Sequence, residues 1–178
     1  MTAQNGDSSL TTSDITDSSA LIHGLTAEEI GTLTAKCTEA KAAAYCPYSL
    51  FRVGCTLLTH SGAFISGANV ENASYPVGTC AERVAMGSAV FAGHRRGDFR
   101  AVAVATDAPE PSSPCGMCRQ FLREFCGEDV PVVMVGRDGG EGRVVVRTMG
   151  ELLPMSFGPE SLPPREELAK VGEGRRKG

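Results

Sequence analysis

The chain has 178 residues and a net charge of −4 at pH 7, with 42% hydrophobic and 21% charged residues. These proportions are typical of a single globular domain with a substantial core. The chain lacks the excess of basic residues that dominates binding to polynucleotides, so we expect no nucleic-acid partner. No apolar run approaches the roughly 20 residues that span a bilayer, so we expect no membrane segment.

Both ends of the chain differ in composition from its middle. Residues 1–24 are rich in Ser, Thr and Asp and poor in large apolar side chains, so we predict a disordered N-terminal tail. This stretch lacks the basic start and the apolar core of a signal peptide. The chain has seven cysteines, an odd number that cannot all pair in disulfides. We therefore expect reduced thiols and a cytoplasmic location. The folded domain is expected over residues 25–165, followed by a flexible charged tail over residues 166–178.

The first predicted elements are a helix and a hairpin. Thr26 and Glu29 form a capping box before apolar residues at helical spacing, which predicts a helix over residues 27–44. Residues 51–59 and 63–70 are apolar and β-branched and are joined by a short turn, which predicts a β-hairpin. The end of the hairpin carries a group of polar and aromatic residues: Asn69, Glu71, Asn72 and Tyr75. This group fits either an ordinary polar loop or a set of ligand-binding residues.

The second half of the chain alternates helices and strands. Helices are predicted over residues 80–93 and 115–125, and buried strands over residues 99–105, 131–135 and 142–148, with a turn at residues 137–140. This alternation predicts an α/β fold with helices packed on the faces of a sheet. Because both helices follow loops at strand ends, the fold should bring their first residues together.

The first residues of these two helices suggest a metal centre. Cys115 and Cys118 are three residues apart and can face one ion, with Cys80 as a third ligand. Three ligands leave one position of a tetrahedral zinc open to water, as in catalytic sites. Glu82 is placed to move a proton of that water, and Arg83 to donate hydrogen bonds to the sulfurs and offset their charge. The spacing C-x-E followed by P-C-x-x-C is typical of zinc nucleobase deaminases.

The metal motif also permits a different kind of site. A lone C-x-x-C occurs in redox pairs and in structural zinc sites. A structural site needs a fourth ligand, and the sequence leaves open that one of four further thiols supplies it: Cys37, Cys46, Cys55 or Cys126.

Five segments in this order carry a recognisable pattern: YSLFRVG (48–54), NVENASY (69–75), TCAER (79–83), SPCGMCRQ (113–120) and LLPMSF (152–157). With them the chain resembles the small homotetrameric zinc-dependent cytidine deaminases, and the resemblance covers about residues 25–165. The resemblance implies a three-layer αβα fold around a five-stranded mixed sheet, one Zn²⁺ per subunit and a homotetramer. It also implies hydrolytic deamination of cytidine and 2′-deoxycytidine to uridine and 2′-deoxyuridine, a reaction of pyrimidine salvage.

The resemblance further implies roles in substrate binding. Phe51 would pack against the pyrimidine, Asn69 and Glu71 would hydrogen-bond the ribose, and the backbone of Ala81 would hold the base.

Two residues would act at a subunit boundary. Residues 151–157 are an apolar stretch that fits either docking on its own core or a subunit contact, and the resemblance favours the contact. Phe157 would then reach into a neighbouring site, with Tyr75 near that boundary.

Two other functions compete with this interpretation. One is deamination of a cytosine-bearing antibiotic such as blasticidin S, which requires the same zinc site. The other is a non-catalytic structural zinc protein that binds a partner.

Overall fold

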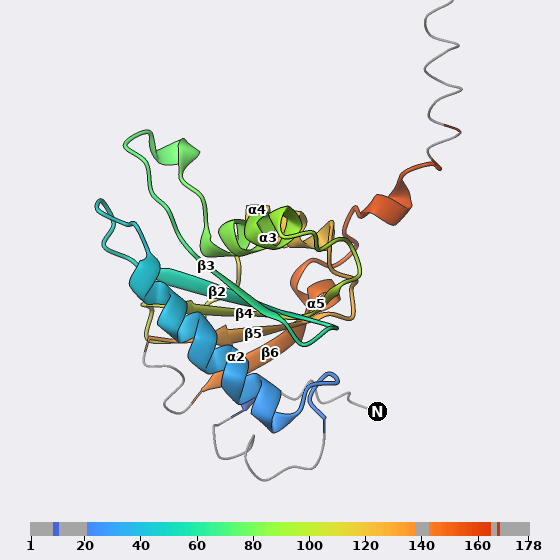
Figure 1. Cartoon of the computed structure of the whole chain (residues 1–178), viewed down its shortest axis with the longest axis horizontal. Helices are drawn as coiled ribbons and strands as arrows, with labels where there is room; N and C mark the ends of the chain where they lie inside the picture. Colours follow the sequence, from blue (N-terminus) through green and yellow to red (C-terminus); the bar gives the residue numbers. More distant parts are fainter. Residues whose placement is uncertain (1–8, 11–20, 138–142, 165–166, 168–178) are drawn as a thin grey trace, which may run out of the picture.

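The computed structural model describes residues 9–10, 21–137, 143–164 and 167, which form a mixed sheet between two helical layers (Figure 1). The strands lie in the order β1-β6-β5-β4-β2-β3. β4 and β5 are parallel, and every other neighbouring pair is antiparallel. The strands are β1 (Ser9–Leu10), β2 (Val53–Thr59), β3 (Phe64–Ala68), β4 (Phe99–Thr106), β5 (Pro131–Val135) and β6 (Val144–Thr148). The predicted mixed sheet of five strands is confirmed by β2 to β6, and β1 adds two residues along the edge of β6.

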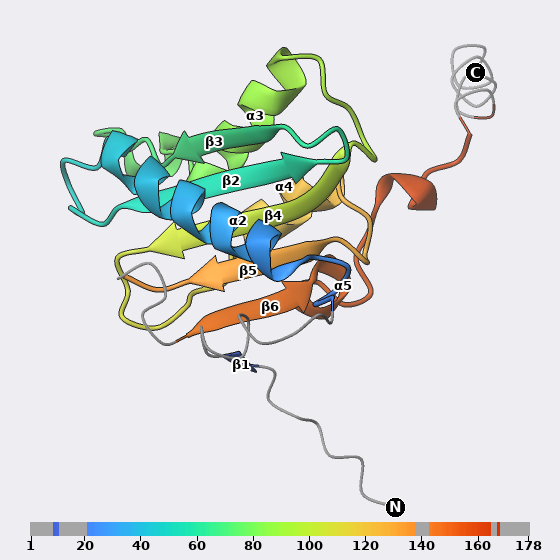
Figure 2. The same ribbon diagram turned by 60° about the horizontal axis from the view of Figure 1, so that its bottom comes forward.

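The helices cover both faces of this sheet. Figure 2 shows α2 (Ala27–Ala40) across one face, with α3 (Ala81–Phe91) and α4 (Gly116–Arg123) behind the other. The short α5 (Met149–Leu152) follows β6 and packs on the same side as α3 and α4. Three 3₁₀ turns complete the described elements: η1 (Lys41–Ala43), η2 (Tyr75–Val77) and η3 (Pro159–Ser161). The predicted three-layer arrangement is therefore confirmed.

Each face of the sheet has its own hydrophobic core. On the α2 side, Ile30, Leu33 and Cys37 pack against alternate residues of the central strands. On the other side, α3, α4 and α5 contribute Ala85, Leu122 and Met149. Because strand side chains alternate between faces, β2, β4 and β5 supply apolar residues to both cores.

Two glycines let the helices approach the hairpin closely. A Cβ on Gly54 of β2 would lie 2.1 Å from the carbonyl oxygen of Cys37 in α2. A Cβ on Gly67 of β3 would lie 2.5 Å from the backbone nitrogen of Ala85 in α3. Larger residues at either position would push a helix off the sheet, and the helix packed over Gly67 follows directly on its N-cap, Cys80.

Several predicted boundaries shift by a few residues. The first helix ends at Ala40 and continues as a 3₁₀ turn, and α4 ends at Arg123. The hairpin is shorter at both ends than predicted, with β2 starting at Val53. Residues 51 and 52 are not in the strand because their N–H groups bond to the side chains of Ser49 and Asp107 instead of to a neighbouring strand.

The predicted tails are described only in part. Within the N-terminal tail, β1 pairs with β6, and Ile22 bridges to Leu25. Residues 1–8 and 11–20 of the N-terminal tail, residues 166 and 168–178 of the C-terminal tail, and residues 138–142 around the predicted turn lie outside the described residues. Among the residues that the structure describes, no helix combines the length and the apolar character needed to cross a membrane.

Candidate active site

The two helices behind the sheet bring three cysteines together at their first residues. Cys80 is the N-cap of α3 and Cys115 is the N-cap of α4, while Cys118 lies in the first turn of α4. Their sulfur atoms all lie within 4.8 Å of one another. Both cysteine segments therefore meet as predicted, although Cys80 and Cys115 precede their helices rather than belong to them.

The three sulfurs fit a single metal ion. Zinc–sulfur bonds of about 2.3 Å in a tetrahedron separate the sulfurs by about 3.8 Å, so only a small movement closes this group around zinc. It is the one such cluster of His, Cys, Asp or Glu side chains in the described part of the chain, and it contains no fourth protein ligand. The arrangement therefore matches a catalytic zinc site with one open position better than a closed structural site.

The thiols considered as a possible fourth ligand lie elsewhere in the fold. Cys37, Cys55 and Cys126 are buried in the hydrophobic cores. Burial raises the pKa of Cys37 and of Cys126 to about 12 and raises the pKa of Cys55 as well, so all three are neutral thiols at pH 7. These three residues act as small apolar side chains, and Cys46 is also outside the cluster.

The ionisation of the cysteines favours a bound cation. A hydrogen bond shared by Cys80 and Cys118 lowers the pKa of Cys80 to about 5 and raises the pKa of Cys118. The Arg83 guanidinium adds to the lowering at Cys80, with Nη2 3.9 Å from the sulfur. The backbone N–H of Cys118 points to the sulfur of Cys115 at 3.5 Å. Cys80 is thus available as a thiolate, the form of cysteine that binds metals.

Glu82 lies in the first turn of α3 and is only 3% exposed. Burial raises the pKa of its carboxyl group, and the charge of Cys80 raises it further. Its Oε2 atom is buried without a hydrogen-bond partner in the structure. A buried carboxylate oxygen without a partner is costly, and its place beside the sulfurs suits a group that bonds to a ligand or to water there.

Ala81 is fully buried between Cys80 and Glu82 as the first residue of α3. The sequence therefore places a thiol of the cysteine cluster, a helix N-terminus and a buried carboxylate within three residues.

Asn69 and Glu71 lie at the end of the hairpin and bind the loop at residues 48–53. Asn69 accepts a hydrogen bond from Val53 N at 2.8 Å and donates one to Phe51 O at 2.9 Å. Glu71 accepts from the backbone nitrogen of Tyr48 at 2.9 Å and from both the backbone and the hydroxyl of Ser49. The Ser49 hydroxyl and these backbone bonds hold the pKa of Glu71 below its usual value, so it is charged at pH 7.

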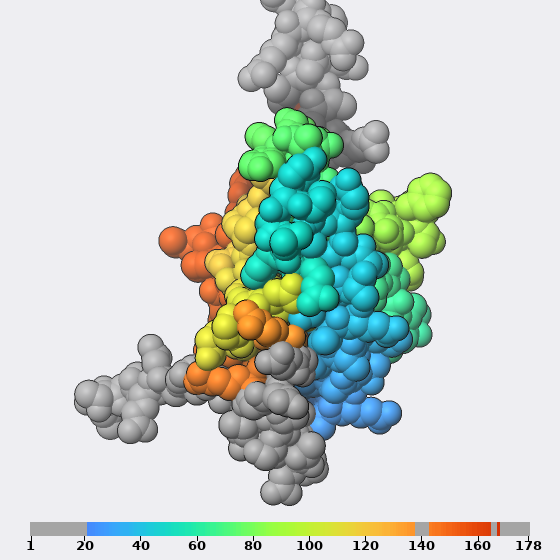
Figure 3. All heavy atoms as spheres, turned by 90° about the vertical axis from the view of Figure 1, so that its left-hand side faces the viewer, coloured from blue at the N-terminus to red at the C-terminus, as the bar shows by residue number. Residues whose placement is uncertain are grey.

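A pocket of about 420 Å³ opens beside Glu71. Its walls come from the two loops around residues 48 and 75, which lie side by side at one end of the molecule (Figure 3). The rings of Tyr48 and Tyr75 are 5.6 Å apart at this pocket. Gly78 also lines it and accepts a hydrogen bond from Arg83 Nη2 at 3.3 Å, so the same arginine contacts the pocket wall and the cysteine cluster.

Two of the predicted substrate-binding aromatics, Phe51 and Phe157, are exposed to solvent, as is Tyr75 at the pocket. Phe51 is 41% exposed and Phe157 is 60% exposed. The backbone oxygen of Phe157 accepts a hydrogen bond from Gln120 of α4 at 2.9 Å, which ties the late apolar stretch to the helix that carries Cys118. Within the single chain, Phe157 remains largely open to solvent.

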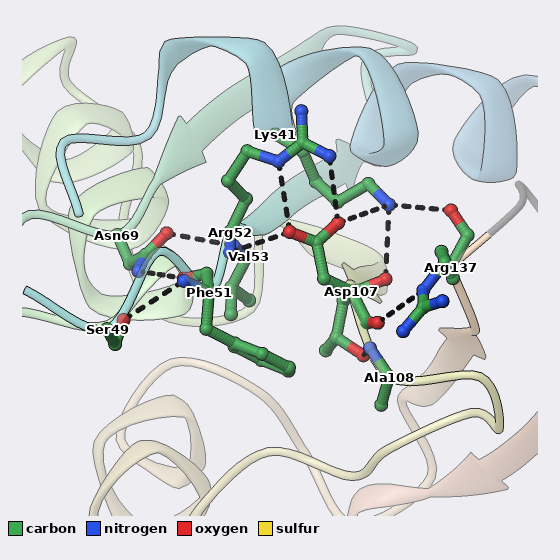
Figure 4. Close-up of polar contacts among 10 residues, drawn as sticks. Lys41, Ser49, Phe51, Arg52, Val53, Asn69, Asp107, Ala108 and Arg137 are labelled. Atoms are coloured by element: carbon green, nitrogen blue, oxygen red, sulfur yellow. Dashed lines mark hydrogen bonds and ion pairs between the residues drawn. The ribbon is translucent and has the colours of Figure 1, made fainter. Parts of the chain in front are cut away.

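Sequence reasoning missed two residues that support the predicted site. Asp107 follows β4 and binds both the backbone and the side chain of Arg52, next to Phe51. Lys41 is 5% exposed and binds Asp107 from the end of α2 (Figure 4). A lysine in the last turn of a helix usually points to solvent, so the sequence carried no signal for its burial.

Comparison with known proteins supports the chemistry of this site. A family model described as the cytidine and deoxycytidylate deaminase zinc-binding region matches residues 27–134. A cytidine deaminase of Sporosarcina psychrophila is 40% identical over 134 residues, which cover 75% of this chain and 95% of the relative. A cytidine deaminase of Halalkalibacterium halodurans is 43% identical over 124 residues, covering 70% of this chain and 90% of the relative.

Solved structures extend the similarity to the fold. The crystal structure of cytidine deaminase from Burkholderia pseudomallei matches with a TM-score of 0.67 and 43% identity, over 71% of this chain and 97% of that one. The crystal structure of cytidine deaminase from Mycobacterium tuberculosis matches with a TM-score of 0.59 and 35% identity, over 71% of this chain and 95% of that one. The similarity therefore spans nearly the whole of these relatives.

Proposed function

The chain belongs to the zinc-dependent cytidine deaminase family, and from this we propose that it hydrolyses cytidine and 2′-deoxycytidine to uridine and 2′-deoxyuridine, releasing ammonia. The observation that carries the proposal is the group of three sulfurs within 4.8 Å beside a buried carboxylate that has an unpartnered oxygen. Three protein ligands suit a catalytic zinc, and the carboxylate supplies the proton transfer that the reaction requires.

Zinc held by Cys80, Cys115 and Cys118 would activate a water molecule at neutral pH. Glu82 takes a proton from this water and passes it to the ring nitrogen N3 of cytidine as oxygen attacks the adjacent carbon C4. It then delivers the second proton of the water to the amino group, which leaves as ammonia. Water and cytidine thus become uridine and ammonia with all atoms accounted for.

The raised pKa of Glu82 suits this double role. A carboxyl group shuttles protons best when its pKa lies near the working pH, and burial moves Glu82 in that direction. Arg83 contacts the sulfur of Cys80, and this hydrogen bond would draw charge from the sulfurs and so keep a bound zinc ion electrophilic.

The hairpin end provides the groups for the sugar and the base. The amide nitrogen of Asn69 donates one of its two hydrogens to Phe51 O, and the second hydrogen can be donated to a ribose hydroxyl. Glu71 is charged, lines the pocket and has further lone pairs for a ribose hydroxyl donor. Phe51 would pack on the pyrimidine, and the backbone of Ala81 would hold the base at the start of α3.

We further propose that the protein acts as a homotetramer in cytoplasmic pyrimidine salvage. In such an assembly Phe157 would enter a neighbouring site, with Tyr75 close to the boundary. The strong exposure of both rings in the single chain, 60% and 73%, supports a role at a contact.

A mixing experiment tests the shared site. Subunits carrying Glu82→Gln and subunits carrying Phe157→Ala are each expected to have low activity. Unfolded together and refolded as mixed tetramers, they should recover activity, because some sites then combine an intact Glu82 with a neighbour's Phe157. No recovery in tetramers shown to be mixed would place Phe157 outside the neighbouring site.

Turnover of three compounds tests the choice of substrate. Purified zinc-loaded protein is assayed with cytidine, 2′-deoxycytidine and blasticidin S under the same conditions. Both nucleosides should be deaminated much faster than the antibiotic. A preference for blasticidin S would overturn the assignment of substrate, and inactivity on all three with zinc bound would support a structural zinc protein.

A further inference from the structure

A buried lysine and an aspartate form an anchor behind the loop that carries Phe51. Lys41 is 5% exposed and lies at the junction of α2 and the following 3₁₀ turn. Its Nζ atom donates to Thr106 O at 3.1 Å, to Asp107 Oδ1 at 3.3 Å and to Arg137 O at 2.7 Å. An ammonium group has three hydrogens, so these partners use all of its donors. Such complete pairing is what makes a buried charge tolerable.

Asp107 connects Lys41 to Arg52 by hydrogen bonds. Its Oδ2 accepts hydrogen bonds from Arg52 N and Arg52 Nε, both at 2.9 Å, and its Oδ1 accepts one from Arg52 Nη2 at 3.2 Å. The backbone oxygen of Asp107 is itself held by Arg137 Nε at 2.8 Å, so the aspartate is fixed from two sides. One carboxylate therefore binds both the backbone and the side chain of Arg52.

Three successive N–H groups, two in this loop and one at the first residue of β2, bond to side chains rather than to the backbone of a neighbouring strand. Phe51 N donates to Ser49 Oγ at 3.1 Å, Arg52 N to Asp107 and Val53 N to Asn69 Oδ1 at 2.8 Å. Leu50 just before them has a φ of 56°, an unfavourable value for a non-glycine residue. The path of the loop thus depends on side-chain anchors, of which only Asp107 is connected to a buried charge.

The anchor and the Phe51 ring lie on opposite sides of this backbone. In Figure 4, Lys41 and the Arg52 guanidinium lie toward α2, while the ring of Phe51 points away from them. Neither Lys41 nor Asp107 lines the pocket beside Glu71. The Phe51 ring is not part of that lining either, and Asp107 reaches the loop that carries this ring by its hydrogen bonds to Arg52.

We propose that Asp107, held by buried Lys41, is a positioning residue for substrate binding that fixes Arg52 and through it the Phe51 ring. The inference rests on the proposed function in one respect, namely that Phe51 packs against the pyrimidine. It assigns to Lys41 and Asp107 an effect on substrate affinity that is separate from the zinc centre.

The test uses Asp107→Asn in the full-length zinc-loaded protein. Asparagine keeps the size of the side chain but loses the charge and one acceptor, which weakens the bonds to Lys41 and Arg52. The KM for cytidine should rise about tenfold, as expected when charge-assisted hydrogen bonds weaken, while kcat stays within about twofold and zinc content is unchanged.

Asp98→Asn is the matched control. Asp98 also accepts a backbone hydrogen bond, from Arg95 N at 2.7 Å, but lies in an exposed turn outside the site. Its KM should equal that of the wild type.

A double-mutant cycle shows whether the effect passes through Phe51. In a Phe51→Ala background, Asp107→Asn should change KM by less than about twofold, because the ring that it positions is gone. A rise in KM as large as in the wild-type background would overturn the proposal, as would a fall in kcat with KM unchanged.

A second variant, Arg52→Met, removes only the exposed side-chain bonds to Asp107 and should raise KM less than Asp107→Asn does. An unchanged KM for both Arg52→Met and Asp107→Asn would also overturn the proposal.

Amide hydrogen exchange provides a readout that does not depend on activity. Asp107→Asn should speed exchange at Phe51, Arg52 and Val53 about tenfold relative to wild type, with the β4 and β5 amides unchanged. Unchanged exchange at these three amides would mean that Asp107 does not order the loop. If the wild-type protein did not deaminate cytidine, the proposed function would fail while this measurement still decided the role of the anchor.

Discussion

The guanidinium of Arg83 lies 3.9 Å from the sulfur of Cys80 and also donates to the backbone oxygen of Gly78 at 3.3 Å. One side chain thus contacts both a predicted zinc ligand and the wall of the pocket beside Glu71. Burial alone would lower the pKa of Arg83, but its contacts with Cys80 and Cys118 outweigh burial and raise it, so the group stays charged. A fixed positive charge beside three sulfurs would compensate for the charge of about −1 that three thiolates would leave on a bound zinc ion.

Arg83→Gln should therefore slow the reaction without emptying the metal site. Substitutions next to metal ligands typically reduce activity about 10- to 100-fold, and we expect kcat to fall in that range. The measurement is kcat for cytidine together with zinc content by atomic absorption. An unchanged kcat at full zinc content would show that the arginine does not tune the metal.

Glu82→Gln should remove proton transfer while keeping the shape of the site. Loss of a general acid–base group typically reduces turnover by about 10² to 10⁴, and we expect a fall in kcat of at least about 100-fold. The comparison is Glu39→Gln on the exposed side of α2, which should leave kcat unchanged. Full turnover by zinc-loaded Glu82→Gln would refute the proposed mechanism.

Arg123 anchors the segment that carries Phe157, and its loss should reduce stability. The side chain is 4% exposed, donates to Ser156 Oγ at 2.8 Å and forms an ion pair with Glu160. Arg123→Met should lower the free energy of unfolding by about 1–3 kcal/mol, because the charge-assisted hydrogen bonds of the buried guanidinium to Ser156 and Glu160 are lost.

Urea denaturation measures this change, and Arg143→Met is its control. Arg143 pairs with Glu110 at the surface, with 55% and 72% of their side chains exposed, and such pairs contribute only about 0–1 kcal/mol. Equal destabilisation by the two variants would show that the buried position of Arg123 has no special role.

The ionisation of Asp107 predicts a specific acid sensitivity. Burial opposes ionisation, but the hydrogen bonds from Arg52 and Lys41 outweigh it and lower the pKa from 3.8 to about 2. Because the folded-state pKa is the lower one, the carboxylate stabilises the fold above about pH 4, and this contribution is lost as the pH falls toward 2.

Asp107→Asn should remove that part of the pH dependence. Between pH 4 and pH 2, the free energy of unfolding of the wild type should fall more steeply than that of the variant. Urea unfolding at several pH values in this range compares the slopes. Parallel curves would show that Asp107 has the same pKa in the folded and unfolded states.

Features encoded within a few residues could be predicted from the sequence. The Thr26–Glu29 capping box, the limits of β5 and the meeting of Cys80 with Cys115 and Cys118 are all confirmed. The capping box and the strand limits depend on local hydrogen bonds and hydrophobic pattern. The cysteine cluster follows from placing two helix starts after the ends of β3 and β4, which lie on either side of β2.

Features that depend on distant partners could not be predicted. Lys41 meets its acceptors 65 to 96 residues further along the chain, so nothing near it in sequence indicates that it is buried. The same holds for residues 51 and 52, which have the composition of a strand but bond to side chains. Even the hydrogen bond of Asn69 to Val53 N spans 16 residues and appears only once the hairpin is formed.

The most direct test of the central claim is the ultraviolet absorbance of cytidine incubated with the purified protein, before and after zinc is removed and again after zinc is restored. The proposed function predicts loss of the cytidine band with native protein, no loss after zinc removal and recovery of the activity when zinc is added back. A cytidine band that persists in the presence of protein shown to contain zinc would contradict it.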